Sequence, residues 1–318
     1  MSRPAEKPQF YNYDPSLAAA IIFTIAFTFI TGFSTYQFYK AFTHPAASKL
    51  DKKRTLIIIP FLLGGLCEII GCIGRCVSSQ DVEAKDPFIM QAVLLLVAAA
   101  LFAATIYMIL GRVIAMLNSA HQSLVPVKWL TKIFVLGDVI SFFMQGIGAS
   151  VRAADQSKAD ISERIIIAGL FVQIAFFGVF MVVTALFQWK IWKTPCPEAQ
   201  ALRFTPSKWF NWQMLLYTLF ACSLLILVRC IIRAVEYIEG YDGYLISNEV
   251  FLYTLDLLLM FINMVLLCWQ DVCGYFAEVG PVSRDEKLLE GSGGGVMEGD
   301  PFKDETEVGS GGVKPVES

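Results

Sequence analysis

The sequence is poor in charge and in the side chains and motifs that most enzymes use for catalysis. Asp, Glu, Lys and Arg make up 17% of its 318 residues, and only two residues are histidine, whereas an ordinary soluble domain carries about 25% charged residues. No phosphate-binding loop, His-Glu-x-x-His zinc motif or Gly-x-Ser-x-Gly nucleophile motif occurs. The eight cysteines show no metal-ligand spacing. The sequence therefore predicts a protein that is not an enzyme, with no cofactor, no metal and no nucleic-acid partner.

The chain is instead rich in long apolar segments, and 56% of its residues are hydrophobic. Seven segments are long enough to cross about 30 Å of hydrocarbon at about 1.5 Å per residue. They cover approximately residues 17–38, 55–77, 90–112, 129–150, 164–187, 212–232 and 249–268. The sequence therefore predicts an all-α integral membrane protein with a seven-helix domain over 17–270, after a short amino-terminal segment at 1–16.

The carboxy-terminal part has a different composition. Residues 278–318 contain ten acidic and four basic side chains, together with Gly/Ser runs at 291–295 and 309–312. Such a segment buries too little apolar surface to offset the entropy of ordering it. We therefore predict a disordered acidic tail over 271–318.

The distribution of basic residues predicts the orientation. If seven helices alternate in direction, twelve Lys and Arg residues lie on the same side of the membrane as the carboxy-terminal tail. Seven lie on the opposite side. The positive-inside rule then puts the amino terminus outside and the tail in the cytosol. All six tryptophans fall at helix ends on the predicted cytosolic face, as they should if no span has been missed or added.

Ionisable and amide side chains inside the spans are the main functional signal, because a charge near the bilayer centre costs roughly 2.5–3.5 kcal/mol. Several are seven residues apart, nearly two helical turns, so each such pair lies on one helix face. Eight of these residues are the candidate substrate-binding residues: Glu68, Arg75, Asp138, Gln145, Arg229, Arg233, Glu236 and Asp256.

The expected depths of these residues predict a polar funnel that opens outward. The helical rise places Glu68, Asp138 and Asp256 within the hydrocarbon, whereas Arg75 and Arg229 come out at or near the outer surface. Carboxylates at the floor of such a funnel favour a cationic guest.

A structural alternative remains open, because intramembrane polar residues also join helices through hydrogen bonds. Arg233 and Glu236, three residues apart, are expected to form a structural pair. Small residues four apart are expected to let helices approach closely. These are Gly137/Ser141, Gly146/Ser150 and Ala99/Ala103.

Several short motifs accompany the seven predicted spans. They are Tyr-x-Tyr-x-Pro-Ser at 11–16, Glu-x-x-Gly-x-x-x-Arg at 68–75, Ile-Tyr-Met at 106–108, Leu-Gly-Arg at 110–112, Asp138 with Gln145 and Gly146, Gly169-Leu170 with Gln173, and Arg229-x-x-x-Arg233-x-x-Glu236-Tyr237-x-x-Gly240-Tyr241-x-Gly243. Over about 11–270 this pattern resembles the fungal lipid-translocating exporters, the RTA-like family named after resistance to aminocholesterol.

The resemblance implies export of sphingoid long-chain bases and resistance to toxic amphipathic compounds, at the plasma membrane. The expected partners are an amphipathic lipid or drug-like ligand and the lipid bilayer. We expect Glu68, Asp138 and Asp256 to hold an amine, and Arg75 and Arg229 to hold those carboxylates or to meet lipid phosphate. A seven-helix lipid or small-molecule sensor that signals without transport remains the alternative, and the oligomeric state stays open.

Overall fold

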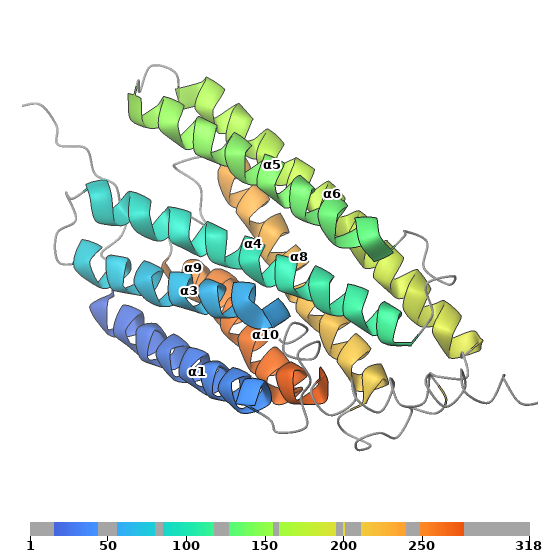
Figure 1. Cartoon of the computed structure of the whole chain (residues 1–318). Coiled ribbons are helices and arrows are strands. Elements are labelled where there is room, and N and C mark those ends of the chain that lie inside the picture. The colour runs from blue at the N-terminus through green and yellow to red at the C-terminus, as the bar shows by residue number, and fades with distance from the viewer. Residues whose placement is uncertain are drawn as a thin grey trace, which may run out of the picture. The chain divides into compact units, whose positions relative to one another are not determined.

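The computed structural model describes residues 16–43, 56–79, 85–117, 127–154, 159–194, 200, 211–239 and 249–276. Within these ranges the regular elements are all helical, and seven of them are long and apolar enough to span a membrane (Figure 1). The spans are α1 (Leu17–Thr43), α3 (Ile59–Ser78) preceded by the 3₁₀ turn η1 (Leu56–Ile58), α4 (Lys85–Met116), α5 (Val127–Ala154), α6 (Ala159–Lys193), α8 (Trp212–Glu239), and a last span made of α9 (Glu249–Leu252), the π-helical turn η4 (Tyr253–Leu257) and α10 (Leu258–Trp269). The predicted seven-helix integral membrane fold is confirmed.

Most spans run further than the sequence predicted, and the extensions of α8 and of the last span bear on the site. Helix α8 continues to Glu239 instead of ending near residue 232, because Arg233 pairs with Glu236 inside the helix. The last span continues past α10 in a short helical turn at 272–276. Asp271 has a left-handed φ of 39° between these two helical stretches, and its Oδ1 accepts the Gly274 N–H at 3.1 Å.

The boundary expected at residue 270 therefore lies too early. Cys273, Tyr275 and Phe276, which were assigned to the tail, are buried in the helical core. The predicted tail after residue 276 and the segment at 1–15 lie outside the described residues.

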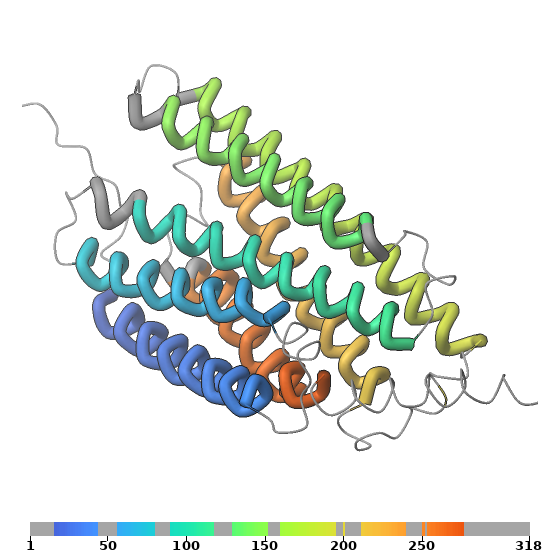
Figure 2. The backbone as a smooth tube through the Cα atoms, in the orientation of Figure 1, coloured from blue at the N-terminus to red at the C-terminus, as the bar shows by residue number. Residues whose placement is uncertain are grey.

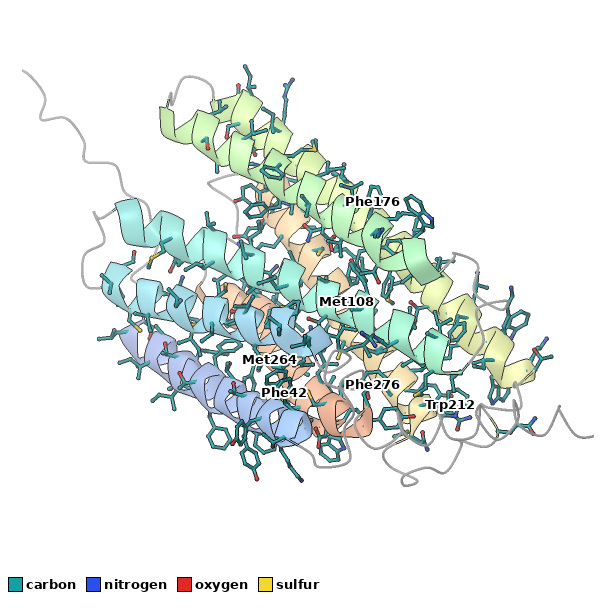
Figure 3. All side chains as sticks on the ribbon, viewed as in Figure 1. Phe42, Met108, Phe176, Trp212, Met264 and Phe276 are labelled. Atoms are coloured by element: carbon teal, nitrogen blue, oxygen red, sulfur yellow. The ribbon has the colours of Figure 1, made fainter. Side chains whose placement is uncertain are left out.

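Successive spans run up and down, so the ends of α1, α4, α6 and α10 meet the starts of α3, α5 and α8 (Figure 2). The five described tryptophans all lie at this end, as the alternation requires: Trp129, Trp189, Trp192, Trp212 and Trp269. Figure 3 shows Trp212 and Phe276 there. Trp209 lies outside the described residues. Tryptophan is enriched where a span meets the membrane surface, so this end of the bundle has the character of a membrane interface.

Helix α4 packs against α3, α5 and α8, and it is the span with the largest buried share. Its residues Ala98, Ala99 and Ala103 are buried, and a Cβ added to Gly64 of α3 would lie 2.6 Å from the Phe102 ring. Ala99 and Ala103 are buried as expected of packing residues, and the closest approach of α3 lies at Phe102 and Ala98.

Helices α5 and α6 also pack closely, as expected at Gly137, where an added Cβ would lie 2.5 Å from the Phe176 ring, and also at Gly148, which was not predicted. A Cβ on Gly148 would lie 2.9 Å from the Ser162 carbonyl oxygen and 2.5 Å from Ile166 Cγ1. Gly146 has nothing within 4 Å of the same position, and Ser150 is exposed. The prediction that Gly146 and Ser150 pack against another helix is therefore wrong, because the face of α5 that approaches α6 carries Gly148.

Alanine substitutions at these two glycines are expected to change stability in opposite directions. Gly146→Ala should stabilise by up to about 1 kcal/mol, the difference in helix propensity between the two residues. Gly148→Ala should destabilise by about 1–3 kcal/mol, because its methyl group overpacks against backbone of α6. Thermal unfolding of the purified variants in detergent micelles measures both, and a higher midpoint for Gly148→Ala would contradict the α5–α6 contact.

Candidate functional site

The π-helical turn η4 places two polar side chains inside the bundle. Tyr253 and Asp256 both belong to this turn, and both are buried. A π turn inserts an extra residue into the helical repeat, and such turns are frequent at functional sites. After this turn the regular α-helix resumes as α10.

Asp256 joins α8 to the last span. Arg229 Nε donates to Asp256 Oδ1, and Arg233 Nη2 donates to Asp256 Oδ2. Arg233 Nη1 also donates to Glu236 Oε2 at 3.1 Å, which confirms the expected pair, and Arg229 Nη2 donates to the Leu95 carbonyl of α4 at 3.2 Å. We call Arg229, Arg233, Glu236 and Asp256 the arginine cluster.

Arg75 of α3 lies beside η4. Its Nε donates to the Tyr253 hydroxyl at 2.8 Å, and its guanidinium carbon lies 4.9 Å from the centre of the same ring. The Tyr253 hydroxyl donates to the Ser16 carbonyl at 3.4 Å, and the Tyr253 ring stacks on Phe23 of α1. Arg75 therefore connects α3 to the last span, and Tyr253 connects that span to the start of α1.

Glu68 is fully buried two turns below Arg75 on α3. Neither of its carboxyl oxygens has a hydrogen-bond partner among the described residues. It lies within electrostatic range of Arg229, Arg233 and Asp256. The structure therefore brings Glu68 close to the arginine cluster and leaves its oxygens unsatisfied by protein, which is costly for a buried carboxyl group.

Asp138 of α5 has a different environment. Its Oδ2 accepts the Tyr107 hydroxyl of α4 at 3.0 Å, whereas its Oδ1 has no partner within the described part of the chain. The Tyr107 ring packs among three phenylalanines, with ring centres 4.5–5.8 Å apart: Phe134, Phe177 and Phe180. The prediction that Asp138 shares one chamber with Glu68 and Asp256 has no contact to support it, because Asp138 bonds to Tyr107 instead.

Gln145, one of the candidate residues, forms a small hydrogen-bond cluster between α5 and α6. Its Nε2 donates to Ser141 Oγ at 2.8 Å and to Gln173 Oε1 at 3.2 Å. Ser141 Oγ donates to the same Gln173 oxygen at 3.3 Å. We call Ser141, Gln145 and Gln173 the amide cluster.

A pocket lies where the amide cluster meets the arginine cluster, between α4, α5, α6 and α8. The cavity itself is small, about 40 Å³, and it opens to the outside. Its lining residues are Ala92, Leu96, Gln145, Leu170, Gln173, Arg229, Cys230, Arg233 and Tyr237. The helical rise places Arg233 about 9 Å and Gln173 about 21 Å from the bundle end opposite the tryptophans.

The pocket differs from the predicted acidic floor in both charge and depth. Gln145, Arg229 and Arg233 line it, whereas none of the candidate carboxylates does. Arg229 lies ten residues inside α8, about 15 Å from its end, instead of at the outer surface. The reason is that α8 continues to Glu239, seven residues past the predicted end.

Sequence reasoning missed the polar partners on neighbouring helices. Tyr107, Gln173 and Tyr237 stood within the motifs, and Tyr253 stood in the last predicted span, but none was proposed as a site residue. The sequence did contain one usable signal for Gln173, which is an uncharged polar residue in an otherwise apolar stretch of α6.

A model of the family described as "RTA1 like protein" matches residues 61–278, which include six of the seven spans. The chain belongs to the RTA1-like family. The expected family is therefore confirmed. No solved structure matches this RTA1-like chain.

Three yeast relatives show how similar this RTA1-like chain is to other members. It is 36% identical to Protein RTA1 of Saccharomyces cerevisiae, over 81% of this chain and 83% of the relative. It is 36% identical to Protoporphyrin uptake protein 1 of the same species, over 88% and 96% of the two chains. It is 27% identical to the Sphingoid long-chain base transporter RSB1, over 66% and 62%.

Proposed function

We propose that this RTA1-like protein translocates amphipathic lipids such as sphingoid long-chain bases across the plasma membrane, and that it is not an enzyme. Export of such compounds confers resistance to toxic amphipaths. The name of the relative RSB1, a sphingoid long-chain base transporter, supports this substrate class. The membrane-spanning fold is consistent with it.

The observation that carries the proposal is the pocket between α4, α5, α6 and α8, which brings two arginines of the polar interior to an opening in an apolar bundle. Buried charges are costly within a bilayer, and in transport proteins they mark substrate paths. A lipid with a polar head and an apolar tail fits such a path, because the head requires polar partners and the tail is compatible with the surrounding hydrocarbon.

Glu68 is the proposed partner of the long-chain base amine. Of the three carboxylates expected to hold the amine, Asp256 is bound by two arginines and Asp138 by Tyr107, whereas neither oxygen of Glu68 has a described partner. Glu68 is fully buried. The amine therefore reaches it only when the helices separate, and the pocket is the entrance to this path.

The opening is proposed to face the outside of the cell. The pocket lies nearer the bundle end opposite the tryptophans. The excess of basic residues at the tryptophan end supports a cytosolic location for that end.

Purified full-length protein in liposomes tests the proposal. Labelled long-chain base should cross the membrane faster in protein-containing vesicles than in empty ones, with a rate that saturates with concentration. Equal rates in both kinds of vesicle would overturn translocation. Saturable binding together with equal rates would instead identify a sensor that signals without transport.

A further inference from the structure

The polar groups that line the pocket are mainly hydrogen-bond donors. Gln173 uses its carbonyl oxygen to accept bonds from Ser141 and Gln145. Its Nε2 group donates to none of the described residues. On the amide cluster side, the pocket therefore has a free N–H donor.

The arginines supply further donors. Arg229 uses Nε for Asp256 and Nη2 for Leu95, which leaves Nη1 without an acceptor among the described residues. Arg233 pairs with Asp256 and Glu236, yet both carboxylates lie outside the pocket lining. The carboxylates that bind the two guanidinium groups thus lie outside the pocket lining. Because both arginines themselves line the pocket, they can also bind a guest there.

We propose that this pocket binds the phosphate or carboxylate group of an amphipathic lipid, as a headgroup subsite separate from Glu68. Planar guanidinium groups bind these anions through paired charge-assisted hydrogen bonds. Three lining residues are apolar (Ala92, Leu96 and Leu170), and the α4 face at Ala92 and Val93 is exposed. The lipid tail would leave the pocket along this face. The subsite rests on the proposed function, because it assigns a headgroup class to the translocated lipid.

Gln173→Glu is the decisive variant. The Gln173 oxygen accepts both described hydrogen bonds, so a carboxylate at this position keeps both and only replaces the N–H donor by a negative oxygen. This negative charge would occupy the anion subsite. The variant therefore keeps the α5–α6 hydrogen bonds, whereas the pocket gains a negative charge in place of an N–H donor.

Equilibrium binding of hexadecyl phosphate and of hexadecylamine to the full-length protein in lipid nanodiscs tests the subsite. The wild-type protein should bind both, the phosphate in the pocket and the amine at Glu68. In Gln173→Glu the ratio of the two dissociation constants should shift about tenfold or more toward the amine, because a like charge close by in a poorly screened site opposes the anion. An unchanged ratio would overturn the proposal.

A matched control makes the same substitution, Gln to Glu, elsewhere on α6. Gln188→Glu places the new charge fifteen residues further along α6, about 22 Å away and outside the pocket lining. The ratio should stay at its wild-type value. A shift equal to that of Gln173→Glu would show a general effect of charge on α6 and would also overturn the subsite.

Inorganic phosphate separates the two sources of the anion. It should displace hexadecyl phosphate only at far higher concentrations, because it lacks the tail. Displacement at equal concentrations would overturn the assignment to a lipid.

The flux experiment is independent of these measurements. If long-chain base does not cross liposomes but the Gln173→Glu shift occurs, the subsite stands without translocation. If base crosses and the ratio is unchanged, translocation stands without the subsite.

Discussion

Replacing Asp256 by Asn is expected to lower the stability of the folded protein by about 3–5 kcal/mol, the usual cost of breaking a buried ion pair from one side. Asp256 accepts hydrogen bonds from both Arg229 and Arg233, and its side chain is almost completely buried. Without the carboxylate, Arg229 has no described anionic partner. Unfolding in mixed micelles with increasing mole fraction of dodecyl sulfate measures the loss.

Two further variants separate this effect from a general loss of charge. Glu236→Gln removes the other acidic partner of Arg233, at a partly exposed position, and should cost less than about 1 kcal/mol. Adding Arg229→Met to Asp256→Asn removes the stranded cation, so part of the stability should return, while Arg233 keeps Glu236. Equal losses in Asp256→Asn and Glu236→Gln would contradict the central position of Asp256 in the arginine cluster.

The spans could be predicted from the sequence because a bilayer leaves few choices for the backbone. Backbone groups must pair within the segment in lipid, so a long apolar segment becomes a helix. Helix ends were predicted less well, and the errors have physical causes. The apolar segment ended near residue 232 and left Arg233 and Glu236 just beyond it, but α8 continues through this ion pair to Glu239.

The candidate site was predictable on single helices, but its contacts between helices were not. Asp138 and Gln145 are both buried on α5, as their spacing predicts. They are about 10 Å apart along the axis, and Asp138 meets Tyr107 of α4 whereas Gln145 meets Gln173 of α6. Spacing predicts which face of a helix is polar, but which neighbouring helix meets each residue depends on packing.

Replacing Glu68 by Gln is expected to reduce translocation of long-chain base more than tenfold while leaving stability nearly unchanged. The variant loses the attraction between carboxylate and ammonium, and a charge-assisted hydrogen bond contributes about 1.5–3 kcal/mol, which corresponds to roughly ten- to hundredfold in affinity. Folding loses little, because neither Glu68 oxygen has a described protein partner. Flux in liposomes and unfolding in mixed micelles measure the two effects on the same preparation.

Asp138→Asn provides the matched control, since it neutralises another buried carboxyl group in the bundle. Asp138 bonds to Tyr107 among phenylalanine rings and does not line the pocket. Its neutralisation should therefore change the flux by about threefold or less, which corresponds to under about 0.7 kcal/mol. Equal losses of flux in the two variants would mean that both carboxylates contact the guest, as the sequence alone suggested. Full flux in Glu68→Gln would remove Glu68 from the path and leave the amine without its proposed partner.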